Sequence, residues 1–78
     1  MTLADMKPGQ NGRIIAIEAS QPSIVRLMVL GLIEDVPFHI ENVAIGGDPI
    51  EVAVFGSSIS IRKQDARSFT VDAISLNG

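Results

Sequence analysis

The sequence predicts a small, mainly β domain of about five strands with one short helix. Its 78 residues provide enough chain for one hydrophobic core, so residues 1–78 are interpreted as a single domain. Gly, Pro, Asn and Ser recur in short clusters along the chain. Between these clusters, apolar and polar residues alternate, which is typical of strands with one buried face.

Five segments between the turns have the length and alternation of strands. They are 13–18, 36–43, 50–54, 58–62 and 69–74, with a short helical turn at 63–67 before the last of them. In the second segment, we expect Phe38 and Ile40 to face the core and His39 and Glu41 to face water. The third and fourth segments flank Gly56, which predicts a hairpin.

One helix is predicted between Ser23 and Leu30. Ser23 follows a proline and is the expected N-cap, and Gly31 is the expected C-terminal stop. Ile24, Leu27 and Leu30 repeat at three-residue spacing and are predicted to face the core. A small antiparallel sheet protects its edges by curling closed, so these elements together favour a compact SH3-like β-barrel.

The opposite side of this helix is also apolar, on a face where water is expected. An exposed apolar cluster on a small domain is typical of an interface. The candidate partner-binding residues are Val25, Arg26, Met28, Val29 and Ile33. In the alternative interpretation, this face is covered by residues 2–6, whose Leu3 and Met6 also need burial.

Composition excludes several classes of function. Without cysteine, the chain has no disulfides, thiolate metal sites or cysteine nucleophile. Its net charge of −3 argues against a nucleic-acid partner, which would need a clustered basic surface. The most apolar run, 27–33, is far shorter than the ~20 residues that cross a bilayer, so no membrane insertion is expected. The first residues show no targeting signal, and we expect a cytoplasmic location.

Catalysis has little support in the residues. His39 is the only histidine and has no nucleophile at an informative spacing, so we expect a non-enzymatic protein without a cofactor. His39, Glu41 and Glu51 are weak candidates for a divalent metal site, and their interpretation as ordinary surface residues is favoured.

Two further features are interpreted as structural. The loop 46–49 lacks the lysine and the helix of a phosphate-binding loop and is expected to be a turn. Arg62, Lys63 and Arg67 form a basic spot that is typical of a solvated edge. Arg13 and Arg26 are the other arginines that a protein partner could contact, and the sequence does not choose among them.

Three segments carry a resemblance to a known family. They are Arg26-Leu27-x-x-Leu30-Gly31-Leu32, then Gly47-Asp48-Pro49-Ile50 after a strand that ends at Ala44, then Gly56-x-x-Ile59-Ser60-Ile61-Arg62-x-x-x-Ala66. In order and spacing, from about Pro8 to Val71, the chain resembles the FeoA family. Two positions depart from the family's pattern. The family usually has a glycine that opens the strand after the helix, where this chain has Glu34-Asp35, and it often has Ala-Pro before the Gly-Asp-Pro turn, where this chain has Ala44-Ile45.

The resemblance implies a small SH3-like accessory domain of bacterial ferrous iron uptake, which accompanies the transporter FeoB and its cytosolic GTPase domain. The leading hypothesis is therefore an adaptor that docks on a FeoB-like transporter. The alternative is a regulatory module that resembles the C-terminal SH3-like domain of iron-dependent repressors. A third hypothesis, a small metal carrier, depends only on His39, Glu41 and Glu51. Weak self-association also stays open.

Overall fold

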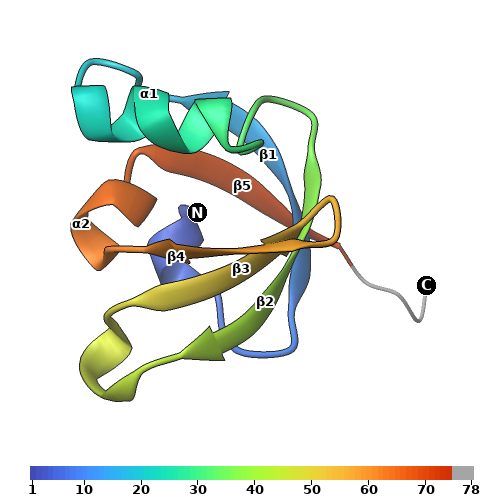
Figure 1. Ribbon diagram of the computed structural model, residues 1–78. Helices are drawn as coiled ribbons and strands as arrows, with labels where there is room; N and C mark the ends of the chain where they lie inside the picture. Colours follow the sequence, from blue (N-terminus) through green and yellow to red (C-terminus); the bar gives the residue numbers. More distant parts are fainter. Residues whose placement is uncertain (75–78) are drawn as a thin grey trace.

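The computed structural model describes residues 1–74 and consists of one antiparallel sheet with short helices at its open side (Figure 1). The elements are η1 (Leu3–Asp5), β1 (Asn11–Ile17), α1 (Pro22–Val29), β2 (Pro37–Val43), η2 (Ile45–Gly47), β3 (Ile50–Val54), β4 (Ser57–Ile61), α2 (Lys63–Ala66) and β5 (Phe69–Ile74). The predicted mainly β fold with five strands and a helix is confirmed, with strand bounds within two residues of those expected. In the described part of the chain, no helix is long and apolar enough to cross a membrane.

The sheet does not close into a full barrel. Its order is β4-β3-β2-β1-β5, so β4 and β5 are both edge strands and do not pair with each other. The N-terminal segment covers part of the β5 edge: Thr2 bridges to Thr70, and the Val71 N–H donates to the Met1 carbonyl oxygen at 3.0 Å. No segment among residues 1–74 pairs with the outer edge of β4. The barrel is therefore open along one side.

The core lies inside the curled sheet, and every strand contributes to it. The alternation expected for β2 is confirmed, because Phe38 and Ile40 are buried while His39 and Glu41 are exposed. The same pattern holds in the β3–β4 hairpin, where inward residues such as Val52 are buried. The buried set is Leu3, Met6, Ile14, Ile24, Leu27, Leu32, Val36, Phe38, Ile40, Ile50, Val52, Val54, Ile59, Ile61, Ala66, Phe69 and Val71.

The start of α1 differs from the prediction. The N-cap is Gln21 and not Ser23, because Pro22 occupies the first helical position, where its fixed φ suits the helix and its missing N–H costs no hydrogen bond. Ser23 lies inside the first turn. Its hydroxyl donates to Asp65 Oδ1 at 3.2 Å and so ties α1 to α2.

The end of α1 confirms the expected role of Gly31. This glycine has a φ of +124°. Its N–H donates to the Met28 carbonyl oxygen at 3.0 Å, and the Leu32 N–H donates to the Leu27 carbonyl oxygen at 3.1 Å. These two bonds form a Schellman motif, which turns the chain toward the core so that Leu32 is buried.

The predicted core position of Leu30 is wrong. Ile24 and Leu27 are buried as expected, but Leu30 is 55% exposed. A helix advances about 100° per residue, so two three-residue steps rotate a side chain about 120° away from the first one. Met28, four residues after Ile24, packs against the core in its place.

Candidate functional site

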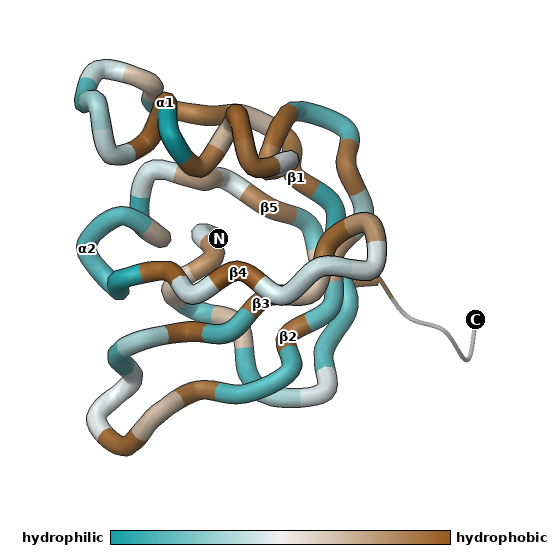
Figure 2. Tube along the Cα trace, viewed as in Figure 1, coloured by the Kyte–Doolittle hydropathy of each residue, from teal (hydrophilic) through white to brown (hydrophobic). Residues whose placement is uncertain are grey.

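A group of apolar side chains is exposed on α1 and in the loops near its C-terminal end. We call it the α1 apolar surface, and it consists of Val25, Val29, Leu30, Ile33 and Phe55. Val29 is 82% exposed and Phe55 is 75% exposed, values that are uncommon for large apolar residues. Figure 2 shows the hydrophobic colouring along the end of α1 and the β3–β4 turn.

The β3–β4 turn brings Phe55 beside the end of α1. The turn has two residues, Phe55 and Gly56, with φ of +50° and +77°, which is a type I′ hairpin turn. A Cβ placed on Gly31 would lie 3.5 Å from Phe55 Cδ2, so the ring stands against the backbone that follows Leu30. The surface thus joins residues that are far apart in the sequence.

Most of the predicted partner-binding residues lie at this surface. Val25, Val29 and Ile33 are exposed, and Arg26 is exposed on the same helix, whereas Met28 is half-buried. The alternative in which the N-terminal segment covers this face is wrong. Leu3 and Met6 are indeed buried, but η1 packs on α2 and β5.

Sequence reasoning missed Leu30 and Phe55. Leu30 was assigned to the core by its spacing alone. Phe55 carried a usable signal, because it occupies a two-residue turn where Asn, Asp or Gly is the usual choice. A phenylalanine at the tip of a hairpin has nowhere to be buried in its own sheet, which makes it a candidate for contact with something else.

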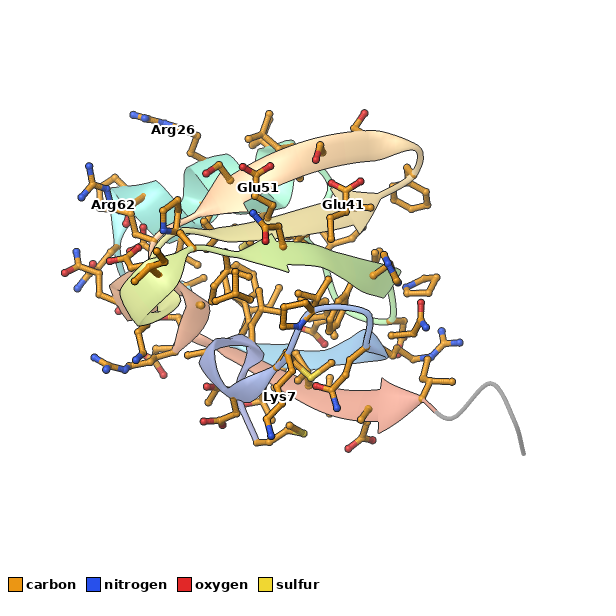
Figure 3. All side chains as sticks on the ribbon, turned by 90° about the horizontal axis from the view of Figure 1, so that it is seen from below. Lys7, Arg26, Glu41, Glu51 and Arg62 are labelled. Atoms are coloured by element: carbon orange, nitrogen blue, oxygen red, sulfur yellow. The ribbon has the colours of Figure 1, made fainter. Side chains whose placement is uncertain are left out.

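A groove lies between α1 and β4, next to the α1 apolar surface, with which it shares Leu30. This α1–β4 groove has a volume of about 440 Å³. It is lined by Ser23, Arg26, Leu27, Leu30, Ser60, Ile61, Arg62, Gln64 and Asp65. Figure 3 shows Arg26 and Arg62 projecting on the same side of the molecule, one from α1 and the other from the chain after β4. The one carboxylate in the lining, Asp65, accepts the hydrogen bond from Ser23.

The residues of the predicted basic spot do not all lie together in the structure. Arg62 shares the α1–β4 groove with Arg26, whereas Arg67 lines a separate depression. The Lys63 N–H at the start of α2 donates to Asp48 Oδ1 at 3.1 Å. The loop that contains Asp48 is a structural turn, as expected from the sequence, and its contact with α2 is a finding of the structure.

The weak metal candidates do not converge. His39 Nδ1 lies 2.9 Å from Asn11 Oδ1, and Glu41 accepts a hydrogen bond from the Ser58 hydroxyl at a β-bulge. Figure 3 shows Glu41 and Glu51 at different positions along the sheet. Within residues 1–74, no three His, Asp or Glu side chains are close enough together to hold a metal ion. The carrier hypothesis therefore gains no support from the geometry.

Comparison with known proteins places these features in a family. A family model described as the FeoA domain matches residues 1–73. Iron(II) transport protein A from Clostridium thermocellum is 30% identical, with a TM-score of 0.87 over 95% of this chain and 46% of that chain. The FeoA protein from Chlorobium tepidum is 32% identical, with a TM-score of 0.85 over 96% of this chain and 71% of that chain. The chain thus spans about half the length of the Clostridium protein. No curated protein matches the sequence.

More distant likenesses show the fold alone. FeoA from Stenotrophomonas maltophilia, solved with zinc and described as a prokaryotic SH3 domain protein, is 22% identical with a TM-score of 0.79 over 92% of this chain and 89% of that chain. A manganese-dependent transcriptional repressor is 17% identical, with a TM-score of 0.82 over 95% of this chain and 41% of that chain. The SH3-like prediction is confirmed, and the open sheet makes it an incomplete barrel.

Proposed function

Because this chain belongs to the FeoA family, we propose that it is a non-enzymatic cytoplasmic accessory protein of ferrous iron uptake that docks on a FeoB-type transporter. The docking would involve the transporter's cytosolic part, including its GTPase domain. One observation supports this proposal most directly, which is the α1 apolar surface. A domain of this size has little apolar area to spare from its own core, so exposing five large apolar side chains on and beside one short helix favours an interface role.

The chemistry of the surface suits a protein partner. A few apolar residues that become fully desolvated supply most of the affinity in many interfaces, and charges at the rim mainly adjust the rate of association. Val29 and Phe55 are the most exposed members and can lose the most water on contact. Arg26 lies between Val25 and Val29 in the helix and supplies a charge at the border.

The test is a titration of the cytosolic part of the FeoB-type transporter with single-residue variants. Val25→Asp and Val29→Asp should leave the circular dichroism spectrum native and weaken binding by at least ~2 kcal/mol. Ile45→Asp is the matched control, because Ile45 is fully exposed on η2, at the far end of the molecule from α1 (Figure 1). The control should bind like the wild type.

The outcomes separate the parts of the proposal. If the wild type does not bind the transporter with or without nucleotide, the docking function is wrong. If it binds and both helix variants bind equally well, the α1 apolar surface is not the docking site. The regulatory-module alternative is supported by the repressor likeness as fold only, and it would become the leading hypothesis if transporter binding is absent.

A further inference from the structure

The outer edge of β4 presents backbone groups without a partner strand. In the two-residue β3–β4 hairpin, Val54 and Ser57 flank the turn and form a hydrogen-bonded pair. Hydrogen-bonded and non-hydrogen-bonded pairs alternate along an antiparallel ladder. Ser58 and Ser60 therefore occupy the non-hydrogen-bonded positions opposite β3. Their N–H and C=O groups point away from β3, toward the free edge.

Neighbouring side chains leave this edge open. Ser58 and Ser60 are exposed, and the Ser58 hydroxyl is bound to Glu41 over the outer face of the sheet, away from the edge itself. The two edges of the sheet differ in this respect, because the N-terminal segment covers part of the β5 edge. An uncovered strand edge is a template for pairing with another chain.

The α1–β4 groove lies along this same edge. Ser60 and Ile61 of β4 form one wall, and Leu27 and Leu30 of α1 form the other. The Arg26 and Arg62 guanidinium groups belong to the same lining, and the one carboxylate in it, Asp65, is engaged by Ser23. Asp48 lines an adjoining depression with Ser60 and Arg62 and accepts a hydrogen bond from the Lys63 N–H. The groove thus combines strand-pairing groups, an apolar wall and an excess of positive charge, on a chain whose net charge is −3.

We propose that the α1–β4 groove binds an extended acidic segment of the partner protein, which adds to β4 as a further strand. Main-chain hydrogen bonds to Ser58 and Ser60 would hold the segment, and its apolar side chains would pack on Leu30. Its carboxylates would pair with Arg26 and Arg62, and this pairing sets the preference for an acidic sequence. The inference rests on the proposed function only in naming the transporter as the source of the segment.

The first experiment tests the edge without the transporter. The probe is a capped peptide of about eight alternating glutamate and valine residues, added to the isotope-labelled protein and followed by amide chemical shifts. We expect saturable shifts at Ser58, Ser60, Arg26 and Arg62. A peptide with lysine in place of glutamate should bind at least about tenfold more weakly. No binding at about 1 mM, or equal binding of both peptides, would overturn the proposal.

A backbone variant makes the test specific to strand pairing. Ser60→Pro removes the outward N–H without breaking a bond to β3, and proline is tolerated at such positions of edge strands. Ser60→Ala is the matched control, because it removes the hydroxyl and keeps the N–H. Ser60→Pro should weaken peptide binding at least about tenfold relative to Ser60→Ala. Equal binding by a natively folded Ser60→Pro protein would contradict strand addition.

Reversal of the two arginine charges provides a second test of the proposal, which does not depend on a proline substitution. Arg26→Glu with Arg62→Glu should reverse the preference, so that the lysine peptide binds better than the glutamate peptide. If the preference stays acidic, the two arginines do not select the segment and the proposal fails. Shifts at Ser58 and Ser60 that depend on protein concentration without any peptide would identify a second copy as the occupant and would also overturn it.

The transporter then separates this inference from the proposed function. If the wild type and Ser60→Ala bind the cytosolic part of the transporter and Ser60→Pro does not, both proposals stand. Equal binding by all three proteins would refute the strand-addition mode and leave the docking function intact. If the wild type does not bind the transporter, the docking function falls, and the peptide results alone decide whether the edge accepts an acidic strand.

Discussion

Gly12 occupies a point in β1 where the neighbouring strands leave no room for a side chain. A Cβ at this position would lie 2.5 Å from the Phe38 ring and 2.8 Å from the Asp72 carbonyl oxygen. Both distances are shorter than any normal contact of a carbon atom. The Asp72 oxygen belongs to the backbone of β5, and it cannot move away without disturbing the pairing of β5 with β1. The smallest residue therefore fixes how closely β2 and β5 approach β1.

Gly12→Ala should lower the free energy of unfolding by about 1–3 kcal/mol, the usual cost of overpacking a core. Urea denaturation followed by circular dichroism measures this loss. Phe38→Leu in the same background should recover part of it, because a smaller side chain opposite the new methyl group relieves one of the two contacts. Unchanged stability of the single variant would show that the strands can separate at little cost.

Phe55 combines an unfavourable backbone conformation with a highly exposed side chain. Its φ of +50° lies in the left-handed region, where a bulky side chain is unfavourable and Asn is tolerated. Phe55→Asn should therefore raise the free energy of unfolding by about 0.5–1 kcal/mol. The same change removes an exposed ring from the α1 apolar surface, so transporter binding should weaken. Higher stability together with weaker transporter binding would indicate that Phe55 is there for contact with a partner and not for stability. A lower free energy of unfolding for Phe55→Asn would contradict this interpretation.

Leu27 and Leu30 provide a matched test of how α1 packs. They are the same residue type one turn apart, but Leu27 is buried and Leu30 is 55% exposed. Leu27→Asp should prevent folding, because an unpaired buried charge costs several kcal/mol in a protein whose total stability is about 5–15 kcal/mol. Leu30→Asp should fold with little change in melting temperature. Thermal melts of the two variants under the same conditions measure the difference, and equal destabilisation would show that the helix is packed more deeply than its exposure indicates.

The strands were predictable because their signal is local. Alternation along Pro37–Val43 and Ile50–Val54 identifies both the strand and its buried face without any knowledge of the partners. The end of α1 at Gly31 was predictable for the same reason. The helix start was not, because Ser23 is used for a contact with Asp65 that depends on the placement of α2.

Tertiary contacts also explain what the sequence could not show of the site. Val25 and Val29 were predicted from the helix alone, but Phe55 reaches the surface only through the hairpin. Arg26 and Arg62 line the same groove only because of how α1 and β4 are placed relative to each other. Asp35 is a related case: it has a φ of +68° where the resemblance implied a glycine, and its carbonyl oxygen accepts a 2.7 Å hydrogen bond from Arg13 Nη1.

Metal binding is expected to contribute nothing to the stability of the whole molecule. The single imidazole is beside Asn11, and Glu41 is bound to Ser58, so neither is free to join Glu51 in a shared site. Isolated carboxylates on a solvated face compete poorly with water for Fe²⁺ or Zn²⁺. Calorimetry should show no stoichiometric site tighter than ~1 μM, and chelator should leave the melting temperature unchanged. A tight site with one metal per chain would revive the carrier hypothesis.

The unequal cover of the two sheet edges limits how far assembly can proceed. Met1 and Thr2 occupy the β5 edge at Thr70 and Val71, and the remaining described part, Asp72–Ile74, is short and carries a charge. A molecule with two open edges can polymerise end to end without limit, whereas a molecule with one open edge cannot. Among residues 1–74, the outer edge of β4 is the one long strand edge without cover. Two copies that paired through β4 would therefore use up both of these edges, and such a complex would be finite and not a fibre.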